Sequence, residues 1–263
     1  MDNNINNIIN IRGVNFANVT MGEAVETAKK FIDENKYENK GVFRARVIHT
    51  PNAEMVQSCI DDKTGDLYNI INSADLIIPD GAGVVLASKI LKTPLKEKVA
   101  GIELAYNLLP YLDNMGGTLF LLGSKEEIVT KAVSNLNAKY KNLKVFYNNG
   151  FFDLSGVKNP EENIKVTEKI NNASPDVVFV CLGSPKQEKW MHKNKEKLNA
   201  KLLIGLGGTI DDIAGVVKRA PKTMIKLNLE WLYRLIKKPS RIGRYMALPK
   251  FAFGTLFMKN PKK

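Results

Sequence analysis

Apolar runs alternate along the chain with stretches in which apolar residues recur at helical spacing. The runs are continuously apolar, which is typical of strands that are covered on both faces of a parallel sheet. This alternation predicts an α/β fold with a mostly parallel sheet and helices on both of its faces. We predict strands over residues 43–50, 75–79, 117–123, 143–149, 176–183 and 201–207.

Three helix starts can be recognised from their capping residues. In a capping box, a Ser or Thr before the helix and a Glu or Gln three residues later bond to each other's backbone N–H groups. Such boxes are predicted at Thr20 with Glu23 and at Ser124 with Glu127. A third helix start is predicted with Ser184 as the N-cap, Pro185 as the first helical residue and Gln187 as the third.

Small and polar residues gather where the predicted strands end. In open α/β sheets, ligands bind beyond the carboxyl ends of the strands. Glycines let the backbone approach a phosphate, and helix N-termini offer it free N–H groups. This edge is therefore expected to form a phosphate- or nucleotide-binding crevice. The residues at these strand ends are Thr50, Asn52, Asp80, Gly81, Gly123, Ser124, Gly183, Ser184, Gln187, Gly205, Gly207, Gly208 and Asp211.

The glycine cluster GLGGTIDD at 205–212 matches the dinucleotide fingerprint only loosely, because Ile210 stands at its sixth position. A plain tight turn is the alternative interpretation of this cluster. No Walker lysine follows any glycine loop. These features argue against an oxidoreductase with a nucleotide cofactor, which stays an alternative on the same fold.

The positive charge lies at one end of the chain. The net charge is +12, and residues 218–263 contain 13 Lys/Arg and one acid, Glu230, which leaves 26 basic and 26 acidic residues before them. We therefore divide the chain into a domain over 1–217 and a basic appendage over 218–263. Such asymmetry indicates contact with an anionic surface, either nucleic acid or membrane.

The appendage combines basic residues with apolar ones. Residues 221–238 show a helical apolar face, and Phe251, Phe253, Leu256 and Phe257 follow. Basic residues beside aromatic ones suit a membrane interface better than nucleic acid. A packed terminal helix with a solvated basic face is the alternative. Neither a signal peptide nor an apolar run of about 18 residues is recognised, so a cytoplasmic protein, peripheral on the inner face of the plasma membrane, is expected.

Neither a metal site nor a bound cofactor is predicted. Cys59 and Cys181 lie far apart in apolar contexts, which predicts reduced thiols in the core. His49 and His192 do not by themselves make a zinc site.

Several segments together resemble the WecG/TagA/CpsF family of glycosyltransferases, over residues 14 to 249. The resemblance implies a Rossmann-like domain with a helical C-terminal appendage. It also implies inverting, metal-independent transfer of N-acetylmannosamine from UDP to undecaprenyl-diphosphate-linked GlcNAc, which forms the linkage disaccharide of wall teichoic acid. A related sugar, ManNAcA or glucose, in another surface polysaccharide stays open, as does self-association in solution. The segments include TPNAEMV (50–56), IPDGAGVV (78–85), CLGSPKQEKW (181–190), GLGGTIDDIAGVVKRAP (205–221) and LEWLYRLIKKPSRIGRY (229–245).

The same resemblance assigns roles to individual residues. It makes Asp80 the base that takes the proton of the acceptor hydroxyl, where the bare residue pattern also allows a turn or helix cap. Thr50 and Asn52 are implied to hold the sugar. Gln187 is implied to act in the site, with a capping role beside Ser184 as its alternative. Asp211 is implied to bind the ribose.

The resemblance extends to cationic residues. Arg234, Arg241 and Arg244 match arginines that are implied to act in the active site on a diphosphate, which guanidinium groups bind bidentately. Lys98 stands where this family usually has an Arg. The planar guanidinium group, which binds bidentately, is thus replaced by the point charge of an ammonium group. The implied substrate-binding set is Gly81, Lys98, Gly123, Ser124, Gly183, Ser184, Gly207, Gly208 and Asp211.

Overall fold

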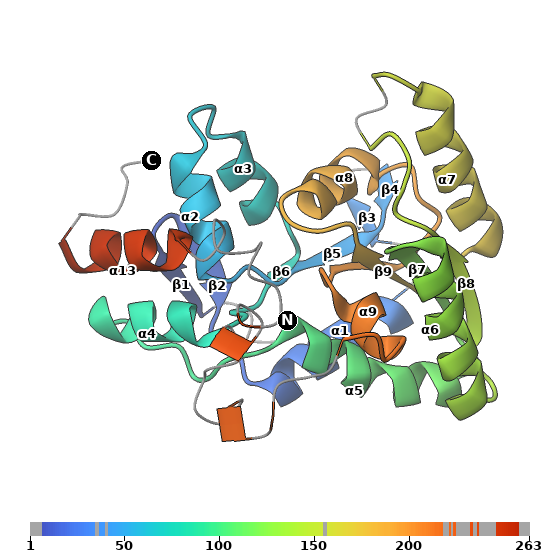
Figure 1. The fold of residues 1–263 in the computed structure, drawn as a ribbon, viewed down its shortest axis with the longest axis horizontal. Helices are drawn as coiled ribbons and strands as arrows, with labels where there is room; N and C mark the ends of the chain where they lie inside the picture. The colour runs from blue at the N-terminus through green and yellow to red at the C-terminus, as the bar shows by residue number, and fades with distance from the viewer. Residues whose placement is uncertain are drawn as a thin grey trace.

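The fold is built on a six-stranded sheet in which every pair of neighbouring strands is parallel, in the order β6-β5-β10-β9-β7-β8 (Figure 1). The computed structural model describes residues 7–34, 37–39, 42–154, 157–217, 221, 223–224, 232–233, 236 and 246–257. The predicted α/β class is confirmed, and each of the six predicted stretches contains one strand of this sheet, although the stretch over 43–50 is divided between two sheets. The strands are β5 (Arg46–His49), β6 (Leu76–Ile77), β7 (Thr118–Gly123), β8 (Lys144–Asn148), β9 (Val177–Cys181) and β10 (Leu202–Gly205).

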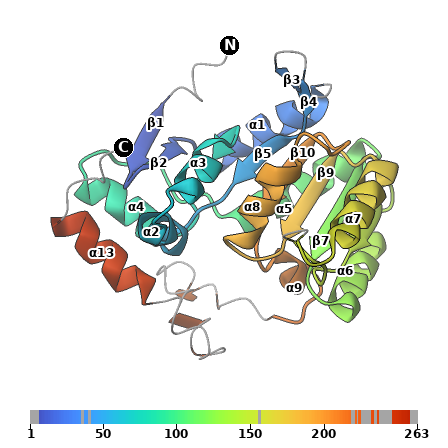
Figure 2. The ribbon, with the colours of Figure 1, turned by 90° about the horizontal axis from the view of Figure 1, so that it is seen from above.

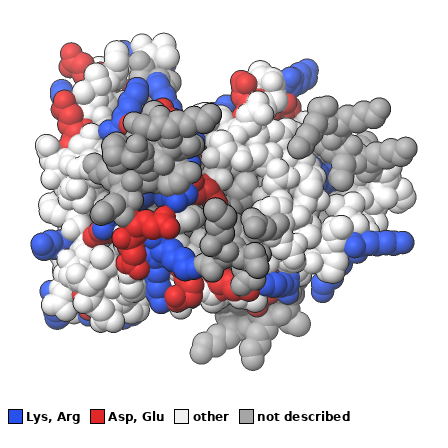
Figure 3. All heavy atoms as spheres, turned by 180° about the vertical axis from the view of Figure 1, so that it is seen from behind, with Lys and Arg blue, Asp and Glu red and all other residues white. Residues whose placement is uncertain are grey.

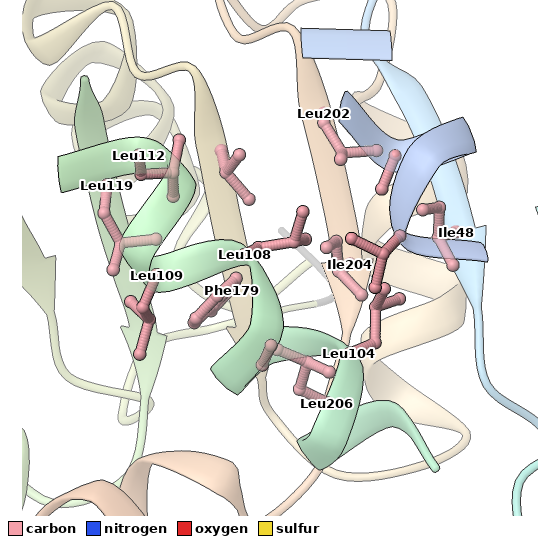
Figure 4. Close-up of a cluster of buried hydrophobic side chains, with 14 of the residues drawn as sticks. Ile48, Leu104, Leu108, Leu109, Leu112, Leu119, Phe179, Leu202, Ile204 and Leu206 are labelled. Carbon is pink, nitrogen blue, oxygen red and sulfur yellow. The ribbon is translucent and has the colours of Figure 1, made fainter. Parts of the chain in front are cut away.

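Helices cover both faces of the sheet, because successive strand residues point to opposite sides. Leu119 and Leu121 of β7 belong to the cluster with α1, α5, α6 and α9, whereas Phe120 and Leu122 pack with α7 and α8. Figure 4 shows the leucines of α5 lying over the strands on the first of these faces. The helices are α1 (Met21–Asp33), α5 (Gly101–Asn114), α6 (Glu126–Lys139), α7 (Pro160–Ala173), α8 (Lys186–Asn194) and α9 (Thr209–Ile213).

A third group of elements packs beside the β6 edge of the sheet. It surrounds its own buried cluster, which includes Phe16, Val56, Ile71, Val84 and Phe251. The helix α13 of the appendage belongs to this group and packs on α2 and α4 (Figure 2). Its elements are β1 (Ile8–Ile11), β2 (Val14–Ala17), α2 (Ala53–Asp61), α3 (Asp66–Asn72), α4 (Ala82–Ile90) and α13 (Ala247–Phe257).

Two antiparallel hairpins were not predicted. Strands β1 and β2 are joined by Arg12 and Gly13, both at positive φ, as a two-residue hairpin turn requires. The other hairpin pairs β3 (Tyr37–Asn39) with β4 (Val42–Arg44). The predicted strand over 43–50 is therefore wrong as one unit: β4 leaves the main sheet, and β5 begins at Arg46 after a break at Ala45.

The three predicted helix starts have different outcomes. The capping box at Thr20 and Glu23 is confirmed, with both of its hydrogen bonds present. The box at Ser124 is wrong, because Ser124 lies at φ 61° and α6 begins after Lys125. The cap at Ser184 is also wrong, because α8 begins after Pro185 and has no side-chain cap.

Both cysteines are free and buried, as predicted, and burial raises the pKa of each thiol to about 12.

Basic and acidic side chains intermingle on the face shown in Figure 3, in line with the balanced charge before residue 218. No helix within the described part of the chain is long and apolar enough to cross a membrane.

Candidate active site

Thr50 and Asp80 meet at the carboxyl ends of β5 and β6. The Thr50 hydroxyl donates to the carbonyl oxygen of Gly205 at 2.8 Å, which ties the end of β5 to that of β10. The Asp80 Oδ2 accepts from the backbone N–H of Gly101 at 3.4 Å. Gly101 opens α5 and also packs on Thr50, because a Cβ atom there would lie 2.9 Å from the Thr50 methyl carbon. The carboxylate thus faces the N-terminus of a long helix, where the helix dipole favours negative charge.

Gln187 reaches the same edge from α8. Its Oε1 accepts from the backbone N–H of Gly207 at 3.0 Å, and its Nε2 lies 3.0 Å from where a Cβ of Gly205 would stand. Gly205 is therefore the point at which Thr50 and Gln187 converge. Gln187 is buried, and it does not pair with Ser184, so its alternative role as a capping residue is wrong.

Ser124 and Asp211 form a second part of the site at the ends of β7 and β10. The Ser124 hydroxyl donates to the Asp211 carboxylate at 2.6 Å. Gly123 precedes Ser124 at φ 139°, and a Cβ atom there would lie 2.4 Å from the carbonyl oxygen of Cys181. The backbone of β9 therefore lies too close to Gly123, at this φ, for any side chain there.

Asn52, Gly81 and Lys98 lie around Asp80. Asn52 caps α2 by accepting from the backbone N–H of Met55 at 3.0 Å, and its side chain is exposed. Gly81, at φ 97°, leads into α4, and a Cβ there would lie 3.7 Å from the Asn52 Cβ. Lys98 is half-buried and precedes Val99, whose N–H donates to the carbonyl oxygen of Pro79. The capping bond engages the Asn52 oxygen, which leaves its amide nitrogen as the donor that Asn52 can offer to a ligand.

The remaining predicted residues divide into those at this edge and those not described. Gly183 and Ser184 follow β9, where the Ser184 hydroxyl donates to the Met55 sulfur at 3.4 Å, and Gly207 and Gly208 lead into α9. The edge thus carries all the predicted residues that the structure describes. Arg234, Arg241 and Arg244 lie outside the described residues, so their predicted roles are not tested.

Residues that the sequence analysis did not single out complete the edge. Tyr106 of α5 donates from its hydroxyl to Asp212 of α9 at 2.6 Å, which ties the two helices together. Gly101 supplies the N–H group for Asp80. Glu188 is buried beside Gln187 and accepts from its Nε2 at 2.8 Å. The PKQE segment was the one available signal for Glu188, and no sequence pattern pointed to Tyr106.

This arrangement offers the Asp80 carboxylate for proton transfer and a glycine-lined edge for an anion. A single base is what an inverting transfer requires, since the acceptor attacks in one step. Among the residues that the structure describes, no three His, Cys, Asp or Glu side chains gather closely enough to hold a metal ion.

Comparisons with known proteins find a matching family model and similar chains. Residues 9–263 match the model of the "Glycosyl transferase WecG/TagA/CpsF family". A protein of Bacillus subtilis (strain 168) is 37% identical over 218 residues, which cover 82% of this chain and 81% of that protein. A protein of Staphylococcus aureus (strain MW2) is 35% identical over 245 residues, or 93% and 91% of the two chains. Both relatives are named N-acetylglucosaminyldiphosphoundecaprenol N-acetyl-beta-D-mannosaminyltransferase.

Proposed function

The chain belongs to the WecG/TagA/CpsF family of glycosyl transferases, and we propose that it moves N-acetylmannosamine from UDP-ManNAc to GlcNAc-diphospho-undecaprenol. The product would be the linkage disaccharide of wall teichoic acid, made at the cytoplasmic face of the membrane. The relatives' shared name supports the sugar and the acceptor. The observation that carries the proposal is the convergence of Asp80, Thr50 and Gln187 at one edge of the sheet.

Asp80 is the base in this mechanism. Its carboxylate takes the proton from the attacking hydroxyl of GlcNAc while that oxygen bonds to the anomeric carbon of the donor. The bond from this carbon to the diphosphate breaks in the same step, and UDP leaves with the electron pair. Attack from the face opposite the leaving group inverts the anomeric centre. The backbone N–H of Gly101 holds the carboxylate in place.

The second part of the site is suited to the nucleotide. The Ser124–Asp211 pair presents a carboxylate, the group that a ribose hydroxyl can donate to. The glycine turn at Gly207 and Gly208 lets a diphosphate approach the backbone before α9. We assign the donor's nucleotide to this part and the transferred sugar to the region of Thr50 and Asn52.

The donor assignment is tested by comparing three nucleotide sugars as donors in separate reactions. The enzyme is incubated with UDP-ManNAc, UDP-GlcNAc or UDP-glucose and a short-chain lipid-diphosphate-GlcNAc, and released UDP is measured. We expect acceptor-dependent UDP release with UDP-ManNAc alone. Turnover with UDP-glucose or UDP-GlcNAc instead would contradict the assignment of the sugar.

Turnover is expected to be unchanged by EDTA. Among the described residues, no group of three or more His, Cys, Asp or Glu side chains is placed to hold a divalent ion. The measurement is UDP release before and after chelation, with added Mg²⁺ or Mn²⁺ as the comparison. Loss of activity on chelation that either ion restores would overturn the metal-independent mechanism.

We also propose that α13 holds the enzyme at the membrane. Phe251 is buried at 3% exposure, which attaches the helix to α2 and α4, whereas Leu256 and Phe257 are 57% and 72% exposed. The rings of Phe253 and Phe257 pack against each other in a tilted arrangement, with their centroids 4.8 Å apart. Exposed aromatic and aliphatic side chains on a docked helix suit insertion at a lipid interface, and the basic appendage would add attraction to anionic lipid.

The double variant Leu256→Ser with Phe257→Ser is expected to weaken binding to phosphatidylglycerol-containing vesicles by about 10²–10⁴-fold, since each apolar side chain that becomes buried contributes roughly 1.5–3 kcal/mol and about 1.4 kcal/mol is a factor of ten. Turnover on a soluble acceptor should be retained. Phe151→Ser is the control, because Phe151 is 74% exposed and follows β8, the strand at the opposite end of the sheet order from β6. Equal vesicle binding by both variants would contradict the role of α13.

A further inference from the structure

Glu188 is a buried carboxyl group that the mechanism above does not use. It lies on α8 with 4% of its surface exposed. Its Oε1 accepts from the Gln187 Nε2 at 2.8 Å, and its Oε2 has no hydrogen-bond partner in the described part of the chain. A carboxylate oxygen that is buried without a partner is costly in its charged form.

The hydrogen bonds around Gln187 determine which oxygen of Glu188 can carry a proton. The backbone N–H of Gly207 needs an acceptor, so the Gln187 Oε1 faces Gly207 and the Nε2 faces Glu188. The Glu188 Oε1 must then act as the acceptor. A proton on Glu188 therefore resides on Oε2.

Burial raises the pKa of Glu188 to about 7, although the Gln187 amide and the nearby Ser184 hydroxyl favour the charged form. The buried groups His49, Cys59 and Cys181 have pKa values far from neutrality. Burial lowers the pKa of His49 to about 3, raises that of Cys59 and Cys181 to about 12, and also lowers that of His192. Cys59 of α2 is the titratable group that interacts electrostatically with Glu188. The neighbouring elements also carry Asp62 directly after α2, Asp66 and Tyr68 of α3, His49 of β5 and Cys181 of β9, whereas β10 has no titratable side chain and the contact of α7 with α8 is made by the uncharged Asn163.

We propose that Glu188 is a positioning residue that must keep its proton for the site to bind the anionic donor. Neutral Glu188 orients the Gln187 amide onto the Gly207 turn. Ionised Glu188 places an uncompensated negative charge two hydrogen bonds away from that turn, in surroundings of low dielectric, where it opposes a diphosphate. This inference rests on the proposed function, which places the donor diphosphate at the turn formed by Gly207 and Gly208.

The sign of the pH effect follows from this geometry. As the pH rises through the pKa of Glu188, its carboxyl loses the proton and donor binding weakens. If only the neutral form binds, the dissociation constant increases about tenfold between pH 6 and pH 8.

The test measures the affinity for UDP by calorimetry from pH 6 to pH 8 with the wild type and Glu188→Gln, which is permanently neutral. Because the titration of UDP itself cancels in the ratio, the wild-type dissociation constant divided by that of the variant is expected to rise about tenfold. Glu196→Gln, an exposed change just after α8, is the matched control for net charge and should follow the wild type. A constant ratio for Glu188→Gln overturns the proposal.

A second measurement needs no variant. Linkage is reciprocal, so UDP that binds the neutral form better must raise the pKa of Glu188, by about one pH unit for a tenfold preference. The carboxyl resonance of Glu188 in carbon-13-labelled wild-type protein reports this pKa with and without UDP. An unchanged or lowered pKa in the presence of UDP overturns the proposal even if Glu188→Gln does not fold.

These outcomes separate the inference from the proposed function. If N-acetylmannosamine is not transferred but the ratio of the UDP dissociation constants rises with pH as expected, the sugar assignment is wrong and the role of Glu188 stands. Transfer with a constant ratio removes only the role of Glu188. Absence of UDP binding at every pH removes both.

Discussion

Asp80→Asn is expected to lower turnover by about 10²–10⁴-fold, the range that removal of a general base typically costs. Asn has nearly the same shape, and its Oδ1 can still accept from the backbone N–H of Gly101. Its amide does not take up a proton from the acceptor hydroxyl. The fold and the affinity for UDP should therefore be retained, which the melting temperature and calorimetry report alongside the rate of UDP release.

A matched control is available at the end of α2. Asp62 accepts from the backbone N–H groups of Thr64 and Leu67, so its carboxylate also stabilises a local turn at the start of a helix, away from the strand ends. Asp62→Asn removes a carboxylate of this kind and should keep wild-type turnover. Near-normal turnover in Asp80→Asn would show that Asp80 only stabilises a local turn, as Asp62 does, and would leave the catalytic base unidentified.

Gly123→Ala is expected to destabilise the fold by about 3–5 kcal/mol, because backbone strain and overpacking add. A Cβ atom at Gly123 would lie 2.4 Å from the carbonyl oxygen of Cys181 and 2.6 Å from its carbonyl carbon, and φ is 139°. Neither backbone atom can move without separating β7 from β9, which are paired here. The melting temperature should fall by roughly 10 °C for a domain of this size.

Gly116→Ala isolates the conformational part of this effect. Gly116 also has a positive φ, 64°, but a Cβ atom there would meet no atom within 4 Å. Its cost should be about 1–2 kcal/mol, that of the left-handed conformation alone. Equal losses of stability in the two variants would show that the close approach of the strands is not what excludes a side chain at Gly123.

The gross architecture could be predicted because it depends on regular patterns. A strand that is covered on both faces must be continuously apolar, so the runs at 117–123 and 176–183 indicated central parallel strands. Carboxyl ends of parallel strands share one edge of a sheet, so Asp80, Thr50 and Gln187 could be placed together without a structure. The resemblance to a family then supplied roles that spacing alone could not.

The orientation of side chains at that edge could not be predicted in the same way. Ser124 has a sequence typical of an N-cap, yet its backbone is left-handed and its hydroxyl bonds to Asp211, far along the chain. Gly150 packs against Gly123 and Ser124, and this contact belongs to neither sequence neighbourhood. A cap requires a particular backbone conformation, and here contacts between distant segments decided that conformation.

The sequence by itself therefore determined the parallel sheet, the polar edge that carries Asp80, and the apolar and basic character of the appendage. Only the tertiary structure decided that Gln187 bonds to Gly207 rather than to a helix end, that Glu188 is buried beside it, and that Phe251 attaches α13 to α2 and α4. The physical reason is the range of the interactions. Hydrophobic periodicity is a property of neighbouring residues, whereas burial and hydrogen-bond partners depend on which distant segments share the same space.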